Sequence, residues 1–281
     1  MTFTTRTIDS DGVSLATRDY GGPAPALVLM HGAGMEQGSL EPLVQQLRGA
    51  FRVVTFDFRG HGGSDLAPWT FATAVQDLNA VAAAYGLGGP AVGGHSLGGM
   101  VAATYGREHP TCPGVINIDG HGRGRVDQYP GYAEVEVRES WDRHQRRLDR
   151  LTRGPVGAAL RGLLVVLGKK PATTATVLRQ VTREVEELDP FARYEQLTCP
   201  LLVFNATAEE DRRLLKLLAA KGVALTRAYR QGLRRDLAAL AADNPLVQAV
   251  EVDARHMLIR THPELVAKHI SDFLQPRAVH G

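Results

Sequence analysis

The residues whose types and spacing could do chemistry lie in segment 91–102, which reads AVGGHSLGGMVA. Gly94, Ser96 and Gly98 match G-x-S-x-G, with an apolar strand-like run before the motif and a helix pattern of small residues after it. A serine on such a tight turn can present its hydroxyl as a nucleophile, and glycine is expected on both sides because a Cβ would clash there. The alternative is a plain glycine-rich turn in which Ser96 only caps the following helix.

Alternating strand and helix patterns surround this turn. A hairpin is predicted over 3–20, and apolar runs typical of strands buried on both faces follow it at 26–30, 51–56, 90–92, 114–118, 200–204 and 246–252. Helical spacing of apolar residues is found at 41–47, 71–85, 211–242 and 263–274. This alternation predicts an α/β fold with a mainly parallel sheet that begins with an antiparallel hairpin.

Segment 123–197 interrupts the alternation. It contains no buried-strand pattern, it is rich in Arg and Glu, and helices are predicted at about 132–151, 157–167 and 175–188. The segment leaves one strand at its carboxyl end and returns to the next, so we expect it to lie over the edge where such sheets bind ligands. The predicted organisation is a core of residues 1–122 and 198–281 with a helical cap or lid at 123–197.

Length and composition restrict the class of protein. The chain has 281 residues, of which 44% are hydrophobic and 22% charged, as in an ordinary globular protein of one large domain with an insertion or two small domains. The formal net charge of +2 is too small to indicate a nucleic-acid or membrane partner.

The cysteines and the N-terminus bear on the expected compartment. Cys112 and Cys199 each stand in a Thr-Cys-Pro sequence, which is neither a metal pattern nor a disulfide framework and is consistent with a reducing compartment. The first residues do not show a basic segment followed by an apolar run, and no apolar stretch reaches membrane-spanning length. We therefore expect a cytoplasmic protein.

Four motifs at strand ends resemble those of the α/β-hydrolase superfamily. They are His31-Gly32, the segment DFRGHGGSD at 57–65, Gly94-His95-Ser96-Leu97-Gly98, and Asp253-Ala254-Arg255-His256-Met257. The resemblance covers nearly all of the chain outside 123–197 and implies an eight-stranded, mostly parallel sheet with helices on both faces and a helical cap. It also implies Ser96 as nucleophile, His256 as general base, and an oxyanion hole from the backbone N–H groups of Leu97 and Ala33.

The chemistry of the residues is consistent with these roles. A serine hydroxyl attacks only when a base takes its proton, and a histidine in a loop can take that proton and return it to the leaving group. Of the ten histidines, only His256 occupies the turn after the last predicted strand. Further residues expected to bind the substrate are Gly32, Gly34, His121 and Met257.

The acid that should orient His256 departs from the superfamily pattern. Members usually carry Asp in a Gly-x-x-Asp stretch after the seventh strand, whereas this chain reads NATAEED at 205–211. The aligned acid is Glu209, which is placed slightly ahead of Asp119 at the end of the sixth strand, with Glu210 third. All three have an ordinary alternative as acids of a helix start or a strand end.

The resulting functional hypothesis is acyl transfer to water. A serine nucleophile argues against epoxide hydrolases and haloalkane dehalogenases, which resemble this fold but need a carboxylate nucleophile. We expect a hydrolase of a carboxylic ester, lactone or thioester that needs no metal and no cofactor. The alternatives are a non-hydrolytic enzyme on the same scaffold (a cyclase, lyase or acyltransferase) and a binding protein with a relic site. The expected partner is a small acyl substrate, with no nucleic acid and no membrane, and a homodimer is left open.

Overall fold

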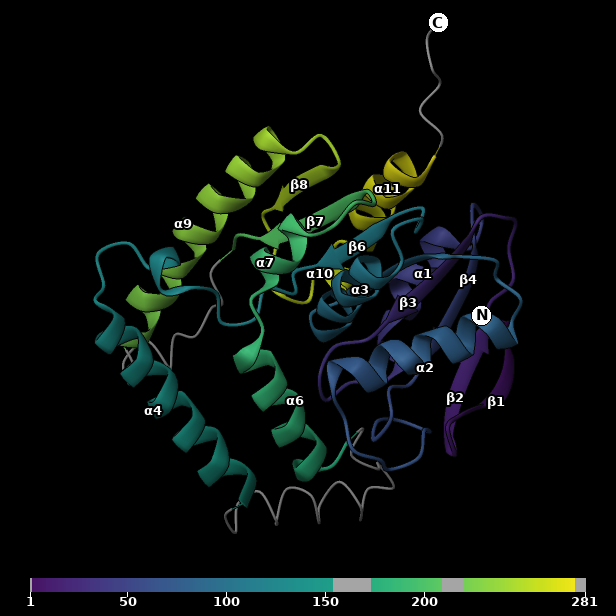
Figure 1. Cartoon of the computed structure of the whole chain (residues 1–281), viewed down its shortest axis with the longest axis horizontal. Helices are drawn as coiled ribbons and strands as arrows, with labels where there is room; N and C mark the ends of the chain where they lie inside the picture. Colours follow the sequence, from purple (N-terminus) through teal and green to yellow (C-terminus); the bar gives the residue numbers. More distant parts are fainter. Residues whose placement is uncertain (1, 154–172, 209–219, 276–281) are drawn as a thin grey trace, which may run out of the picture.

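Eight strands form one sheet in a computed structural model that describes residues 2–153, 173–208 and 220–275 (Figure 1). Their order across the sheet is β1-β2-β4-β3-β5-β6-β7-β8. The strands are β1 (Thr4–Ser10), β2 (Val13–Asp19), β3 (Ala26–Met30), β4 (Arg52–Phe56), β5 (Ala91–His95), β6 (Val115–Ile118), β7 (Leu201–Ala206) and β8 (Val247–Val252). The predicted hairpin, β1–β2, is antiparallel, β2 also pairs with β4 in the antiparallel direction, and all other pairs are parallel, so the sheet is mainly parallel as the sequence predicts.

Helices cover both faces of the sheet. They are α1 (Glu41–Leu47), α2 (Phe71–Ala84), α3 (Leu97–Glu108), α4 (Glu134–Arg153), α6 (Ala175–Glu187), α7 (Pro190–Glu195), α9 (Ala220–Asp243), α10 (Leu258–Thr261) and α11 (Pro263–Leu274), with short 3-10 turns at Gln37–Leu40 and Val126–Gln128. None of these described helices combines the length and the apolar character that crossing a bilayer requires.

Alternate residues of the central strands enter two separate cores. In β3, Val28 and Met30 pack into the core formed with α2, α3, α7 and α9, whereas Leu27 and Leu29 pack into the core formed with α1, α10 and α11. All four side chains are fully buried, which explains why this strand is continuously apolar. The sheet is therefore a rigid platform, and its parallel strands end at one edge.

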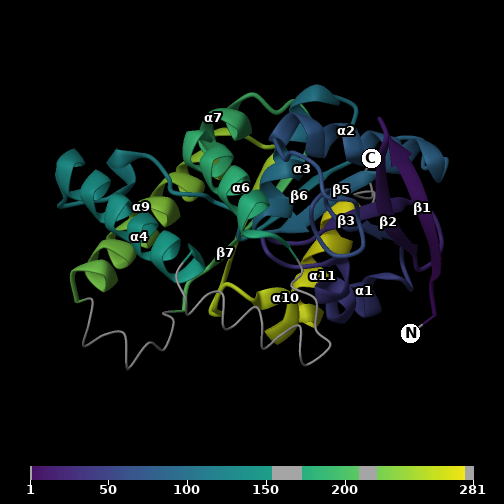
Figure 2. The same ribbon diagram turned by 90° about the horizontal axis from the view of Figure 1, so that it is seen from below.

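The described parts of the segment between β6 and β7 are largely helical. Helices α4 and α6 lie close to the predicted ranges 132–151 and 175–188, and α7 is a short helix that the sequence analysis did not anticipate. The helix predicted at 157–167 falls outside the described residues, as do the first residues of the one predicted at 211–242. Both α4 and α6 extend away from the sheet beside the carboxyl ends of its strands (Figures 1 and 2).

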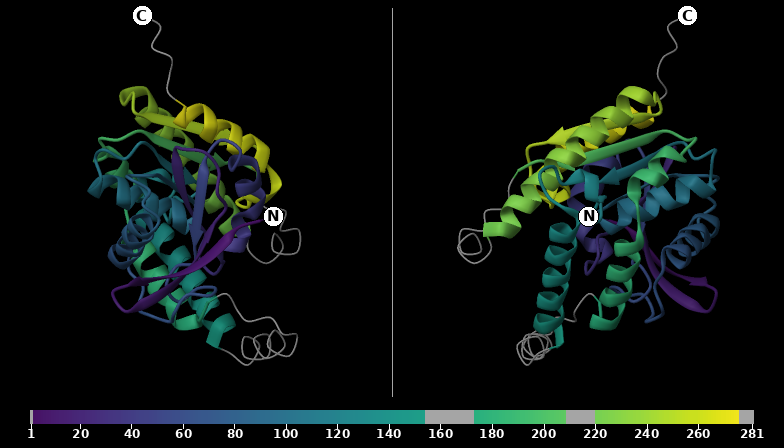
Figure 3. Two further views of the ribbon diagram at one scale, coloured as in Figure 1. Left: turned by 90° about the vertical axis from the view of Figure 1, so that its right-hand side faces the viewer. Right: turned by 60° about the vertical axis from the view of Figure 1, so that its left-hand side comes forward.

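Helix α9 also contributes to this side of the molecule. It follows β7 in sequence and packs against the 3-10 turn at Val126–Gln128. Helices α4 and α6 stand apart from each other (Figures 1 and 3), and side chains of α4, α6 and α9 line one common cavity. Tyr229 of α9 stacks on Tyr129 with ring centroids 5.1 Å apart, in a small apolar cluster that also contains Val137 and Leu225. The space between these helices and the strand ends holds the candidate site.

Candidate active site

Ser96 occupies the sharp turn between β5 and α3. Its backbone has φ 54° and ψ −113°, a conformation that non-glycine residues rarely adopt and that turns the side chain away from the path of the strand. The flanking glycines are required: a Cβ on Gly94 would lie 2.7 Å from Gly98 Cα, and one on Gly98 would lie 2.4 Å from the Met30 carbonyl oxygen. The reason predicted for these glycines from the sequence is therefore confirmed.

His256 and Asp119 form a close pair at the ends of β8 and β6. The Nδ1 of His256 lies 2.6 Å from Oδ2 of Asp119. Because a carboxylate can only accept, Nδ1 carries the proton and donates, and Nε2 keeps its lone pair. The His256 side chain is 41% exposed and that of Asp119 only 11%, so the pair has a buried end and an accessible end. No hydrogen bond joins Ser96 to the His256 ring in the described part of the chain, and such contacts often tighten only in the substrate complex.

Asp119 is held as a carboxylate. Burial, the largest single effect, raises the pKa of Asp119, but the hydrogen bond with His256, the nearby imidazoles of His121 and His256 and the Ala206 N–H together outweigh it, so the pKa lies below its ordinary value. The Ala206 N–H donates to Oδ1 at 2.9 Å. A negative charge is thereby fixed against the protonated nitrogen of His256.

His95 contacts both the backbone and the ring of His256. Its Nε2 lies 2.8 Å from the His256 carbonyl oxygen, so that nitrogen donates, and the two rings lie 4.6 Å apart. Burial lowers the pKa of His95 to about 4, which keeps the ring neutral. The contact of His95 with His256 is a feature that sequence spacing did not reveal.

A cavity of about 420 Å³ contains Ser96, Asp119 and His256 in its wall. This volume suits a small molecule. Apolar and aromatic side chains make up much of the lining: Leu97, Met100, Trp141, Val181, Val185, Tyr229 and Leu233. The polar lining includes Arg123 and Glu186, which form an ion pair, and Arg230, whose guanidinium donates to the Ala208 carbonyl oxygen.

The two predicted oxyanion donors belong to residues of this same cavity wall. Leu97 is the first residue of α3, and the first N–H groups of a helix have no partner within the helix. Ala33 follows β3, and its neighbour Gly32 lies so close to the serine that a Cβ on Gly32 would be 3.4 Å from Ser96 Cβ. Both backbone segments thus flank the serine.

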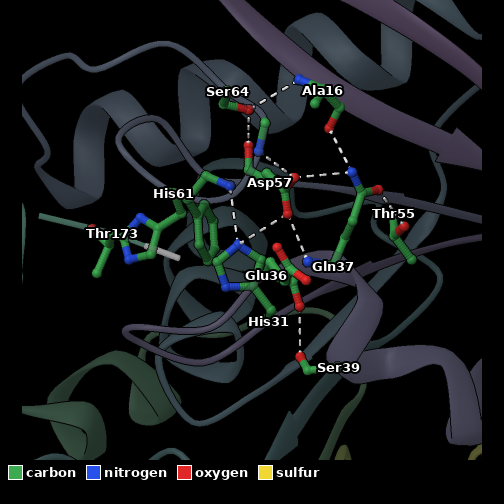
Figure 4. Close-up of polar contacts among 12 residues, drawn as sticks. Ala16, His31, Glu36, Gln37, Ser39, Thr55, Asp57, His61, Ser64 and Thr173 are labelled. Carbon is green, nitrogen blue, oxygen red and sulfur yellow. Dashed lines mark hydrogen bonds and ion pairs between the residues drawn. The ribbon is translucent and has the colours of Figure 1, made fainter. Parts of the chain in front are cut away.

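A buried polar network holds the loop that contains Ala33 (Figure 4). His31 Nε2 accepts from Phe58 N–H at 3.1 Å, and His61 Nε2 accepts from Gly34 N–H at 3.3 Å. Asp57 accepts from the Gln37 N–H at 2.6 Å and from the Gly63 N–H at 2.9 Å. The DFRGHGGSD motif therefore ties the loops after β3 and β4 together.

The other predicted substrate contacts have different positions. His121 lies in the cavity wall, with Nε2 donating to the Phe204 carbonyl oxygen at 3.0 Å. Gly32, Gly34 and Met257 are not among the described residues that line the cavity, although Gly32 abuts Ser96 and Gly34 is bonded to His61. Glu209, the acid placed first from the sequence, and Glu210 lie outside the described residues. The acid that the structure brings against His256 is the alternative, Asp119.

Sequence reasoning missed the contribution of α9. Thr226, Tyr229, Arg230 and Leu233 face the cavity from this helix, and their spacing of three and four residues is that of one helical face. That periodicity was visible in the sequence, but it predicts only a buried face and not what the face covers. Among the described residues, no three His, Cys, Asp or Glu side chains converge as a metal site would require.

Comparison with known proteins shows the family of the chain. The model of the alpha/beta hydrolase family matches residues 27–269. The chain is 38% identical over 89 residues to a pimeloyl-[acyl-carrier protein] methyl ester esterase of Chromobacterium violaceum, an alignment that covers 32% of this chain and about a third (34%) of the esterase.

Solved structures show the same fold. One is an E-2-(acetamidomethylene)succinate hydrolase, with a TM-score of 0.68, 21% identity, and 98% of this chain and 100% of that chain covered. Another is the enol-lactonase from Burkholderia xenovorans LB400, with a TM-score of 0.61, 21% identity, and 96% and 100% covered. Because the family model matches most of the chain and the sheet has the order described above, this protein belongs to the alpha/beta hydrolase family.

Proposed function

We propose that this protein is a serine hydrolase that cleaves a carboxylic ester or lactone through an acyl-enzyme, with Ser96 as nucleophile, His256 as general base and Asp119 as the acid of the triad. The observation that carries the proposal is the 2.6 Å contact between His256 Nδ1 and Asp119 Oδ2, at the wall of a cavity that also contains Ser96. In this arrangement Asp119 is a carboxylate that accepts from His256 Nδ1, which leaves His256 Nε2 free to act as the base.

The proposed reaction begins with attack of Ser96 Oγ on the carbonyl carbon of the substrate. His256 Nε2, which holds a lone pair because Nδ1 carries the proton, accepts the serine proton. The imidazolium that forms is stabilised by the Asp119 carboxylate. The Leu97 and Ala33 N–H groups donate to the oxyanion of the tetrahedral intermediate, helped by the positive end of the α3 dipole.

Breakdown of the intermediate uses the same groups. His256 returns its proton to the oxygen of the leaving alcohol, and the acyl group remains on Ser96. A water molecule then gives up a proton to His256 and attacks the acyl carbon. As the bond from the acyl carbon to Ser96 Oγ breaks, His256 returns that proton to Oγ, which releases the acid and restores the serine. In a lactone the leaving alcohol is part of the same molecule, so a single hydroxy acid is released.

The cavity lining supports a small acyl substrate. Met100, Val181 and Val185 offer an apolar surface next to Ser96 on which an acyl chain can pack, and Trp141 of the proposed cap segment, 123–197, borders the same space. The names of two relatives point the same way, since one is a methyl ester esterase and another an enol-lactonase.

The test is turnover of a panel of p-nitrophenyl esters, lactones and acyl thioesters by the wild-type protein and by Ser96→Ala. We expect hydrolysis of at least one class, and a loss of kcat of about 10³-fold or more in Ser96→Ala, which leaves only binding and oxyanion stabilisation. Circular dichroism of the variant checks that the fold is retained. Equal turnover by the two proteins contradicts the proposal. Wild-type conversion of a substrate without uptake of water would favour the cyclase, lyase or acyltransferase alternative.

A further inference from the structure

The backbone at Asp119 is strained. Its φ of 58° lies in the left-handed region, which few non-glycine residues adopt, although Asp does so more often than most, and which costs free energy that the surroundings must supply. The Asp119 N–H donates to the Phe204 carbonyl oxygen at 3.1 Å, so the strand pairing continues up to this residue. The chain must then turn at once to aim the carboxylate at His256.

Asn117 encloses that turn in hydrogen bonds. Its Oδ1 accepts from the Gly120 N–H at 2.8 Å, and its Nδ2 donates to the Gly120 carbonyl oxygen at 2.8 Å. The side-chain amide can be oriented in only one way, because the Gly120 N–H can only donate and must therefore face the oxygen. Asn117 is completely buried, so these bonds do not compete with water.

The amide lies between this turn and the turn that contains Ser96. A Cβ on Gly120 would lie 2.1 Å from the Ser96 carbonyl oxygen, and a Cβ on Gly99 would lie 2.2 Å from Asn117 Oδ1. Glycine at both positions lets the amide touch both turns. A shift of the Asn117 side chain would therefore change the position of Asp119 relative to Ser96.

Tyr194 accepts a second hydrogen bond from the Asn117 amide nitrogen. Its hydroxyl oxygen accepts from Asn117 Nδ2 at 2.5 Å, and its ring is completely buried. Tyr194 lies on α7, the last helix before the chain returns to β7, and the next residue toward the N-terminus, Arg193, donates to Thr104 Oγ1 of α3 at 2.9 Å. Helix α7 is thus anchored on α3 and presents one hydroxyl group to the Asn117 amide.

We propose that Asn117 and Tyr194 are positioning residues that hold Asp119 in line with His256, so that α7 is coupled to the alignment of the catalytic acid. The proposal rests on the proposed function, because it takes Asp119 to be that acid. Neither residue is among those that line the cavity in the described part of the chain, so they act through Asp119 and not on the substrate.

The test compares Tyr194→Phe with a matched control, Tyr85→Phe. Tyr85 is also buried, and its hydroxyl shares a 2.6 Å hydrogen bond with Thr17 Oγ1 of β2; neither of these two residues lines the cavity around Ser96. Each substitution removes one buried hydroxyl and keeps the ring. We expect Tyr194→Phe to lower kcat at least about fivefold with KM within about twofold, whereas Tyr85→Phe leaves both within about twofold.

A spectroscopic measurement tests the coupling without turnover. The ¹⁵N resonances of the His256 imidazole, assigned by their loss in His256→Gln, report on its bond to Asp119. We expect them to shift in Tyr194→Phe and in Asn117→Ala but not in Tyr85→Phe. Unchanged resonances together with a kcat equal to that of Tyr85→Phe would overturn the inference. Failure of the proposed function is a different result: the wild-type protein would then turn over no ester, lactone or thioester, while the resonances still show whether Tyr194 acts on His256.

Discussion

At the level of single residues, the pair of Asp119 and His256 determines the acid–base chemistry of this site. The carboxylate is buried and ionised, and the imidazole is accessible with its lone pair on Nε2, so the pair can take a proton from a nearby serine. An acid in this position stabilises the imidazolium and fixes the tautomer of the ring. Asp119 follows β6 and accepts a hydrogen bond from Ala206, the last residue of β7. Members of this superfamily usually carry the acid after that strand, β7.

The first prediction separates the two acids considered from the sequence. In Asp119→Asn the amide NH₂ can face His256 Nδ1 only if the proton moves to Nε2, which removes the lone pair that accepts the serine proton. We expect kcat to fall by about 10³- to 10⁴-fold. Steady-state kinetics on the best substrate of the panel, with Glu209→Gln as the comparison, measure this loss. A larger loss in Glu209→Gln than in Asp119→Asn would restore Glu209 as the triad acid.

At the level of elements, the site depends on the loops that follow β3 and β4. The β3 loop contains Ala33, one of the proposed oxyanion donors, and it has little structure of its own. His61, from the β4 loop, accepts from Gly34 N–H through Nε2 and donates from Nδ1 to the Arg59 carbonyl oxygen at 3.2 Å. Burial lowers the pKa of His61, so its ring stays neutral and Nε2 remains an acceptor.

We therefore expect His61→Leu to weaken the oxyanion hole. The substitution leaves the Gly34 N–H without its acceptor, and the neighbouring Ala33 N–H loses its fixed direction. kcat should fall about tenfold with little change in KM, since an oxyanion donor acts mainly in the transition state. Thr173→Val is the control, because it removes the 2.7 Å bond from Thr173 Oγ1 to the Gly60 carbonyl oxygen in the same loop and leaves His61 in place. An equal loss in the two variants would mean that only the stability of the loop matters.

Elements whose formation depends on local composition could be predicted from the sequence, and features that depend on long-range packing could not. The strands around Ser96 are apolar runs because each is buried on both faces, so local composition was sufficient to predict them. The acid could not be chosen that way: Asp119 and Glu209 follow neighbouring strands, and the direction of a side chain depends on a backbone angle that sequence patterns do not encode. Helix α9 lines the site and α7 contacts Asn117 behind it, and both arrangements depend on packing between distant segments, which periodicity alone does not identify.

At the level of the whole molecule, four histidines that are buried in the described part of the chain make the fold sensitive to acid. Burial lowers the pKa of His31 to about 3 and that of His95 to about 4, and it also lowers the pKa values of His61 and His121. In the unfolded chain each would titrate near its ordinary pKa of about 6.5. The unfolded state therefore binds more protons below this pH, and stability is lost as the pH falls from about 6.5 toward 4.

The larger number of protons bound by the unfolded state predicts a measurable pH dependence of stability. Urea unfolding followed by circular dichroism should give a free energy of unfolding that is nearly constant above pH 7 and falls by several kcal/mol between pH 6.5 and 5, because each buried histidine contributes up to ~1.4 kcal/mol per pH unit. The lowered pKa of Asp119 adds a further loss only below about pH 4. His95→Gln removes one of these titrating groups, so the free energy of unfolding of this variant should fall less steeply with decreasing pH. A free energy that stays constant from pH 7 to 5 would contradict the burial of these rings in a neutral state.

The central claim, that Ser96 is an activated nucleophile, is tested most directly by reaction with an alkyl fluorophosphonate followed by mass spectrometry of the intact and digested protein. The account predicts one covalent adduct per chain, located on Ser96, formed rapidly by the wild-type protein and far more slowly by Asp119→Asn and His256→Gln. A protein that remains unmodified, or an adduct on another residue, would contradict it.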